Sequence, residues 1–114
     1  MTRTIAVLMD RIDAIHPEKD TTLALLLEAQ RRGHALLYMT QGDLAVRDGT
    51  AWAKLAPIEV RDSTRDWFSL GEARWQALAH AADIVLARKD PPFDTQFLYD
   101  TLVLDLAARA GVRV

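Results

Sequence analysis

The stretch Thr4-Ile5-Ala6-Val7-Leu8-Met9 is a continuous apolar run that ends at Asp10. Such a run, without alternation of polar residues, is typical of a central strand that is covered on both faces. Leucines at helical spacing predict a helix over residues 21–32, which ends at Gly33, and a second apolar run predicts a strand over residues 35–39. Strand, helix and strand in fewer than forty residues indicate a parallel βαβ unit.

The rest of the chain continues the alternation of strands and helices. Asp48-Gly49 lies between two strand-like runs and predicts a β-hairpin at about residues 43–60, which we expect outside the main sheet. Further along the chain we expect a loop over 61–70, a short helix over 75–82, a strand over 84–87, a helix over 95–110 with Asp94 as its N-cap, and a strand beginning at 112.

This order of elements predicts an α/β domain, specifically a small Rossmann-like, three-layer domain with a mainly parallel sheet. Among the strands outside the hairpin, numbered along the chain, we expect the order 2-1-3-4 across the sheet. Strands 1 and 3 are then neighbours, so that Asp10 and Arg88 end adjacent strands and face one crevice at the carboxyl edge. Ligands of open α/β sheets bind at that edge.

Composition excludes several classes of function. The 114 residues form a single domain with a net charge of −2, and 26% of the residues are charged. The two signs are spread evenly, so no basic face indicates nucleic acid or an anionic membrane. The chain has no cysteine, and its N-terminal apolar run is too short for a signal peptide or a membrane span. We therefore expect a cytoplasmic protein.

The residues after the strand at 84–87 are the most specific part of the sequence. They read Arg88-Lys89-Asp90-Pro91-Pro92-Phe93-Asp94-Thr95, so that two cations and two acids surround a pair of prolines. Prolines fix φ and remove N–H donors, which gives the charged side chains a defined direction. A plain surface turn requires neither feature.

This run closely resembles the end of the first domain of bacterial glutathione synthetase. Other segments match the same family in the same order: Val7-Leu8-Met9-Asp10, Lys19-Asp20-Thr21-Thr22, Leu26 to His34, Tyr38-Met39, Gly42-Asp43-Leu44 and Asp66-Trp67-Phe68. The resemblance spans about residues 4–114. Arg11 departs from it, because the family commonly has proline there, and a loop without that proline is less rigid.

The resemblance implies a ligase of glutathione biosynthesis that joins γ-glutamylcysteine to glycine with ATP and magnesium. The chain corresponds to the pre-ATP-grasp, substrate-binding domain, and we expect it to be an inactive fragment whose ATP-grasp region lies beyond residue 114. A glycine-rich phosphate loop and a convincing magnesium site are both missing from the sequence, so we expect ATP and magnesium to bind outside this segment. The expected partners are the peptide substrate and the ATP-grasp region. A homo-oligomer is also possible on the sequence alone.

By position in the motif and by chemistry, Arg88 is the first candidate to hold a substrate carboxylate. Asp90 or Asp10 would accept the substrate ammonium or orient Arg88. The remaining candidates at this edge are Lys89, Thr21 and Asp20.

Each candidate also has a structural interpretation. Arg88 and Asp90 could form an ion pair that braces the turn, Asp10 could be a turn residue, and Asp20 a helix cap. At the level of function, the alternatives are another ATP-grasp amino-acid ligase and a free-standing α/β binding or regulatory module. The three histidines are spread out and do not predict a metal site, and Trp52, Trp67 and Trp75 are expected to pack, with Trp67-Phe68 also a candidate patch for another domain.

Overall fold

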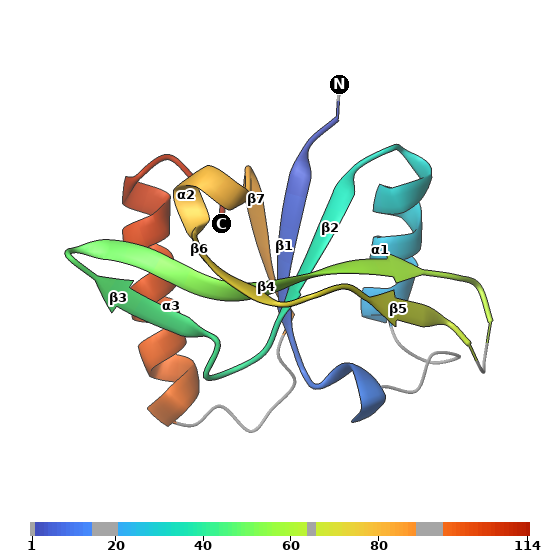
Figure 1. Ribbon diagram of the computed structural model, residues 1–114, viewed down its shortest axis with the longest axis horizontal. Coiled ribbons are helices and arrows are strands. Elements are labelled where there is room, and N and C mark those ends of the chain that lie inside the picture. The colour runs from blue at the N-terminus through green and yellow to red at the C-terminus, as the bar shows by residue number, and fades with distance from the viewer. Residues whose placement is uncertain (1, 15–20, 64–65, 89–94) are drawn as a thin grey trace.

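The computed structural model describes residues 2–14, 21–63, 66–88 and 95–114 and shows a mixed α/β domain (Figure 1). Its strands are β1 (Thr4–Met9), β2 (Ala35–Met39), β3 (Leu44–Arg47), β4 (Thr50–Val60), β5 (Phe68–Leu70), β6 (Arg74–Ala77) and β7 (Ile84–Arg88). Its helices are the 3-10 turn η1 (Ile12–Ala14), α1 (Thr21–Arg31), the single turn α2 (Leu78–Ala81) and α3 (Thr95–Arg109). The predicted α/β class and both long helices are confirmed.

The centre of the sheet is parallel, as the apolar runs predict. β1 pairs in parallel with β2 on one side and with β7 on the other. The expected last strand is reduced to a single parallel bridge between Ile84 and Arg113, next to β7. The predicted order of these segments across the sheet is therefore confirmed. All side chains of β1 from Ile5 to Met9 are buried, which explains why the sequence shows no polar alternation there.

The prediction of a mainly parallel sheet is wrong, and the reason is β4. This strand has eleven residues and pairs antiparallel with β2, β3, β5 and β6. The hairpin between β3 and β4 forms as predicted, with Asp48 at φ 52° and Gly49 at φ 73° in its turn. It does not stand outside the sheet, because Ala56 and Pro57 of β4 pair with β2 and join the hairpin to the parallel strands.

The predictions for residues 61–82 also need correction. The expected loop contains β5. The first part of the expected helix, residues 75–77, belongs to β6, and only the single turn α2 is helical. Trp75 lies opposite Lys54 of β4 and is 49% exposed, so it does not belong to a buried helix face. The available edge of β4 offers backbone hydrogen bonds to this segment, and this tertiary pairing overrides the weak helical spacing.

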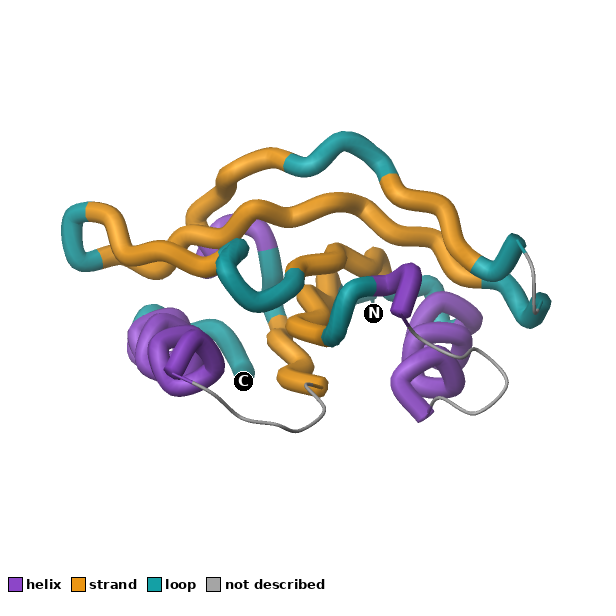
Figure 2. The backbone as a smooth tube through the Cα atoms, turned by 90° about the horizontal axis from the view of Figure 1, so that it is seen from below, coloured by secondary structure: helices purple, strands orange, loops and turns teal. Residues whose placement is uncertain are grey.

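Two hydrophobic clusters lie on opposite sides of the parallel strands. One joins β1 to α3 and includes Leu8, Leu55 and Val103, and the other joins β1 to α1 and includes Val7 and Leu26. Seen from below, the two helices flank the parallel strands, and the antiparallel strands arch over all of them (Figure 2). β4 contributes to both clusters. Trp67 is buried in the α1 cluster, which confirms its packing role and argues against a patch for another domain at that position.

Candidate functional site

The carboxyl edge of the parallel strands brings predicted residues together at the level of the backbone. Met9 of β1 pairs with Arg88 of β7, and Leu8 pairs with Met39 of β2. Asp10 and Thr40 follow directly after these pairs. The ends of β1, β2 and β7 therefore lie side by side, which is where the sequence placed the site.

Arg88 is held by a residue of the first helix. Its Nη2 donates a hydrogen bond to Oγ1 of Thr21 at 2.9 Å, and Thr21 is the first residue of α1. This bond brings together two of the predicted site residues, which are far apart in the sequence. A guanidinium has five N–H donors, and the first turn of a helix has backbone N–H groups without partners inside the helix. Both features favour an anion, so this corner suits a carboxylate.

Asp10 lies at a hollow on the same edge. A cavity of about 270 Å³ is lined by Met9, Asp10 and Arg11 from the end of β1 and by Thr40 and Gln41 from the end of β2. Arg88 is not among these lining residues. The common crevice for these two side chains stays a prediction. A carboxylate beside a cavity of this size can accept hydrogen bonds from an ammonium group.

Two hydrogen-bonded turns shape this cavity, and no functional role was predicted for their residues. The hydroxyl of Tyr38 accepts a bond from the backbone N–H of Ile12 at 3.0 Å, which ties the turn η1 to β2. Asp43 Oδ2 accepts from both the backbone N–H and Oγ1 of Thr40, each at 2.9 Å, and so fixes the turn that carries Gln41. Asp and Asn commonly stabilise turns in this way, and Gly42, at φ 88°, supplies the left-handed residue of this one.

Tyr38 keeps its proton at neutral pH. Burial raises the pKa of its hydroxyl above the ordinary value of 10, and the carboxylates of Asp43 and Asp13 act in the same direction, against the opposing N–H of Ile12. A neutral phenol can both accept and donate a hydrogen bond. The only sequence signal for this role was that Tyr38 and Asp43 belong to segments of the family resemblance.

Three of the predicted site residues, Asp20, Lys89 and Asp90, lie outside the described residues, as do the two prolines of the turn. Within residues 2–14, 21–63, 66–88 and 95–114, no group of three His, Asp or Glu side chains could hold a metal ion. The same part of the chain has no helix that is long and apolar enough to cross a membrane.

Comparison with known proteins identifies the family. A family model described as "Prokaryotic glutathione synthetase, N-terminal domain" matches residues 4–114. The glutathione synthetase of Xanthomonas axonopodis pv. citri is 49% identical over 114 residues, which is 100% of this chain and 36% of that protein. The corresponding identities are 43% over 100% of this chain for Pseudomonas aeruginosa and 41% over 96% of it for Shewanella oneidensis, with 36% and 35% of those proteins covered.

The chain thus spans about a third of the length of the curated relatives that it matches, with 36% of the first one covered. The match falls on the N-terminal domain model and is nearly complete, from residue 4 to residue 114. The chain belongs to the family of prokaryotic glutathione synthetase N-terminal domains.

Proposed function

We propose that this chain is the peptide-binding part of a glutathione synthetase, the ligase that joins γ-glutamylcysteine to glycine. The observation that carries the proposal is the corner formed by Arg88 and Thr21, where a guanidinium is held beside the N-terminus of α1 at the carboxyl edge of the sheet. The peptide substrate has two carboxylates, and this corner is complementary to one of them.

Each candidate residue has a role in this proposal. Arg88 binds a substrate carboxylate through the donors that Thr21 does not use, and Thr21 holds the guanidinium in place. Asp10, at its cavity, accepts the substrate ammonium. Asp20, Lys89 and Asp90 are proposed to surround the same corner, by their positions next to Thr21 and Arg88 in the sequence.

ATP and magnesium, which the reaction requires, are proposed to bind in an ATP-grasp region outside this segment. ATP would supply the activation of the peptide carboxylate, whereas the residues of this chain bind and orient the peptide. The donor sets of the described residues suit a carboxylate and an ammonium better than a magnesium ion, which prefers several oxygen ligands. We place the whole enzyme in the cytoplasm. The ATP-grasp region is the proposed partner of this domain, and we also propose that copies of the enzyme associate with each other.

The sharpest experiment uses the complete synthetase that contains this chain. Arg88→Ala removes the carboxylate clamp, so the KM for the peptide should rise roughly 10- to 100-fold while the KM for ATP changes less than about twofold. Thr21→Val should raise the peptide KM by a smaller factor, because the guanidinium is retained but no longer held. Arg3→Ala is the matched control, since Arg3 lies at the opposite end of β1 and outside the site. An unchanged peptide KM in Arg88→Ala would remove Arg88 from the site.

A second experiment addresses the 114-residue chain by itself. Isothermal titration with millimolar γ-glutamylcysteine or glutathione should show weak binding, because most of the cleft is contributed by other parts of the enzyme in this proposal. Binding as tight as that of a complete enzyme would contradict the division of the site between two regions.

A further inference from the structure

The cavity at the ends of β1 and β2 has an acid and a cation in its lining. Asp10 and Arg11 follow each other along the chain, and both line the cavity together with Met9, Thr40 and Gln41. Thr40 and Gln41 are polar but uncharged, so the charges of the described lining residues sum to zero. A lining of this kind is complementary to a zwitterion rather than to a simple anion or cation.

Arg11 is held by a neighbouring side chain, as Arg88 is held by Thr21. Its Nη2 donates a hydrogen bond to Oδ2 of Asp13 at 2.9 Å, and both side chains are exposed, so a ligand can reach the guanidinium. A guanidinium has five N–H donors, so this bond leaves donors for a carboxylate. The backbone on either side of Arg11 is fixed as well, because Met9 is buried and the N–H of Ile12 is bonded to Tyr38.

The guanidinium groups of Arg11 and Arg88 both lie toward the α1 side of the carboxyl edge. Arg88 donates to Thr21 of α1, and Tyr38, whose hydroxyl binds the turn after Arg11, packs against the α1 cluster. Burial raises the pKa of the Tyr38 hydroxyl, and the charge of Arg11 opposes this rise, so this guanidinium lies near the hydroxyl. The edge therefore offers two separate cations to a ligand.

The spacing of these two positions suits the two carboxylates of the peptide. Neighbouring strands lie about 4.8 Å apart, so a cavity between the ends of β1 and β2 is about 7 Å from the end of β7. In γ-glutamylcysteine seven bonds separate the two carboxyl carbons, and an extended chain of that length spans about 8 Å. One carboxylate can therefore lie at the cavity while the other lies at the Arg88 corner.

We propose that the cavity binds the γ-glutamyl end of the peptide, with Arg11 holding its α-carboxylate and Asp10 its ammonium. Only this end carries both charges on one carbon atom, which matches an acid and a guanidinium on successive residues. The cysteinyl end has a carboxylate alone and is left to the Arg88 corner. This inference rests on the proposed function, and it adds the orientation of the peptide and a binding residue, Arg11, that departs from the family resemblance.

The test uses the complete synthetase and three peptides that share the cysteinyl end. γ-Glutamylcysteine has both charges at its other end, 4-aminobutanoyl-cysteine lacks only the α-carboxylate, and glutaryl-cysteine lacks only the ammonium. Arg11→Ala should raise the KM for γ-glutamylcysteine roughly 5- to 20-fold and leave that for 4-aminobutanoyl-cysteine within about twofold. Asp10→Asn should raise the KM for γ-glutamylcysteine by a similar factor and leave that for glutaryl-cysteine within about twofold.

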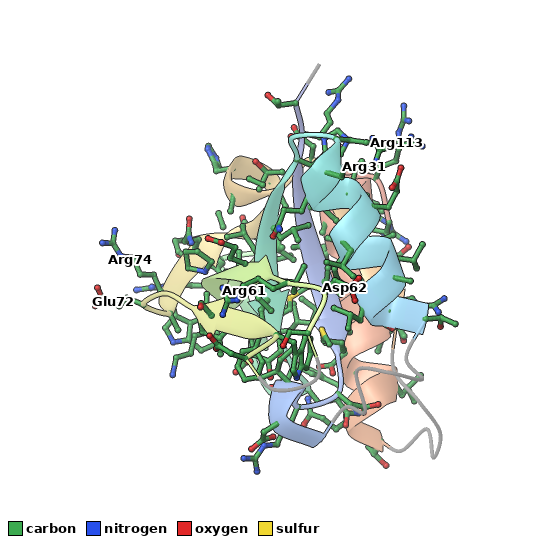
Figure 3. The ribbon with its side chains drawn as sticks, turned by 90° about the vertical axis from the view of Figure 1, so that its right-hand side faces the viewer. Arg31, Arg61, Asp62, Glu72, Arg74 and Arg113 are labelled. Atoms are coloured by element: carbon green, nitrogen blue, oxygen red, sulfur yellow. The ribbon has the colours of Figure 1, made fainter. Side chains whose placement is uncertain are left out.

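Control variants separate recognition of the α-carboxylate from a general loss of binding or folding. Arg88→Ala removes the clamp for the cysteinyl carboxylate, which all three peptides share, and should raise all three KM values by a similar factor. Arg74 lies on β6 and projects away from the body of the molecule, as Glu72 does (Figure 3), so Arg74→Ala should change none of them. Arg11→Lys keeps the charge without the planar fork and should recover part of the affinity. Arg11→Ala should hardly change Tm, because its ion pair with Asp13 is exposed.

Two outcomes would overturn this inference and leave the proposed function standing. One is an Arg11→Ala variant whose KM for γ-glutamylcysteine is unchanged or rises no more than its KM for 4-aminobutanoyl-cysteine. The other is an effect of Arg88→Ala that disappears with 4-aminobutanoyl-cysteine, because the two ends of the peptide would then be reversed. The proposed function fails in a different way, through an Arg88→Ala variant whose KM is unchanged for all three peptides.

Discussion

The two regions of this molecule are stabilised in different ways. The parallel strands β1, β2 and β7 lie between α1 and α3, and the side chains of β1 are buried on both faces. In the antiparallel region, each half of β4 has one face on the core and one toward solvent, so buried residues alternate with more exposed ones along most of β4. The candidate site lies at the carboxyl edge of the first region.

The antiparallel region is nevertheless part of the same hydrophobic core as the parallel region. Leu55 of β4 is buried in the α3 cluster, and Ile58 of the same strand is buried in the α1 cluster. The alternation of buried and exposed residues along β4 is interrupted between them, because the successive residues Leu55 and Ala56 are both buried. Ala56 is also where β4 pairs with β2. A single strand, β4, therefore contributes buried side chains to both hydrophobic clusters. Rigidity at the site depends on both regions.

The largest expected effect tests this dependence. Leu8 of β1 and Leu55 of β4 are both 0% exposed and belong to the same cluster, so Leu8→Ala and Leu55→Ala should each lower the free energy of unfolding by about 2–5 kcal/mol. Leu98→Ala is the control, because Leu98 is 60% exposed and its loss should cost less than about 0.5 kcal/mol. Urea unfolding measures all three. A Leu55→Ala variant as stable as the control would mean that β4 is not part of the common core.

The next effect concerns the hydrogen bonds that tie α1 to β4. Gln30 Nε2 donates to the carbonyl of Val60 at 2.7 Å, and its Oε1 accepts from the N–H of Val60 at 2.9 Å. Gln30→Ala leaves both backbone groups without this partner, and should cost about 1–3 kcal/mol. Hydrogen exchange of the Val60 amide should become faster in the same variant.

Gln30→Glu is the matched variant for this pair of bonds. Glutamate still accepts from the N–H of Val60, but its second oxygen faces the carbonyl and repels it at neutral pH. Protonation supplies an O–H donor, so the loss of stability relative to the original chain should be smaller at pH 4 than at pH 7. A loss that is independent of pH would contradict the proposed geometry.

The sequence predicted the parallel region well because its signals are local. Continuous apolar runs and the helix stop at Gly33 each depend on a few neighbouring residues, and φ of 87° at Gly33 agrees with the expected left-handed cap. The turn at Asp48-Gly49, in the antiparallel region, was predicted for the same reason. The antiparallel pairings are not local. The residues around Trp75 do not indicate that an edge of β4 is available for pairing. The helical spacing of the apolar residues in this segment was therefore the stronger local signal.

The site shows the same division. The motif and the rule for sheet edges predicted the neighbourhood of Arg88, Thr21 and the end of β1, and the bond between Arg88 and Thr21 agrees with it. The supporting bonds of Tyr38 to Ile12 and of Asp43 to Thr40 could not be predicted, because they depend on how the chain turns after β1 and after β2. Polar residues in turns give no sign of which backbone group they will bind.

A smaller effect isolates the turn of the antiparallel region. Gly49 has φ of 73°, and a Cβ placed on it would meet no atom within 4 Å. Gly49→Ala should therefore cost about 1–2 kcal/mol through backbone conformation alone, with no steric clash. Gly49→Asn should cost less, because asparagine tolerates this conformation. Thermal unfolding distinguishes the two variants, and an equal loss in both would contradict this reason.

The smallest effect lies on the outer surface of α1, in the parallel region. Glu28 accepts hydrogen bonds from Nε of Arg31 and Nε of Arg32, each at 2.9 Å, and these bonds lower the pKa of its carboxyl from 4.5 to about 2. A lowered folded-state pKa means that the stabilisation is complete above about pH 4.5 and disappears as the pH falls toward 2. The effect on stability should be small, because all three side chains are exposed and screened by salt. Glu28→Gln should lower Tm slightly at pH 7 and not at pH 2. An NMR titration of Glu28 with a midpoint near the ordinary pKa of a glutamate, 4.5, would show that these bonds do not persist in solution.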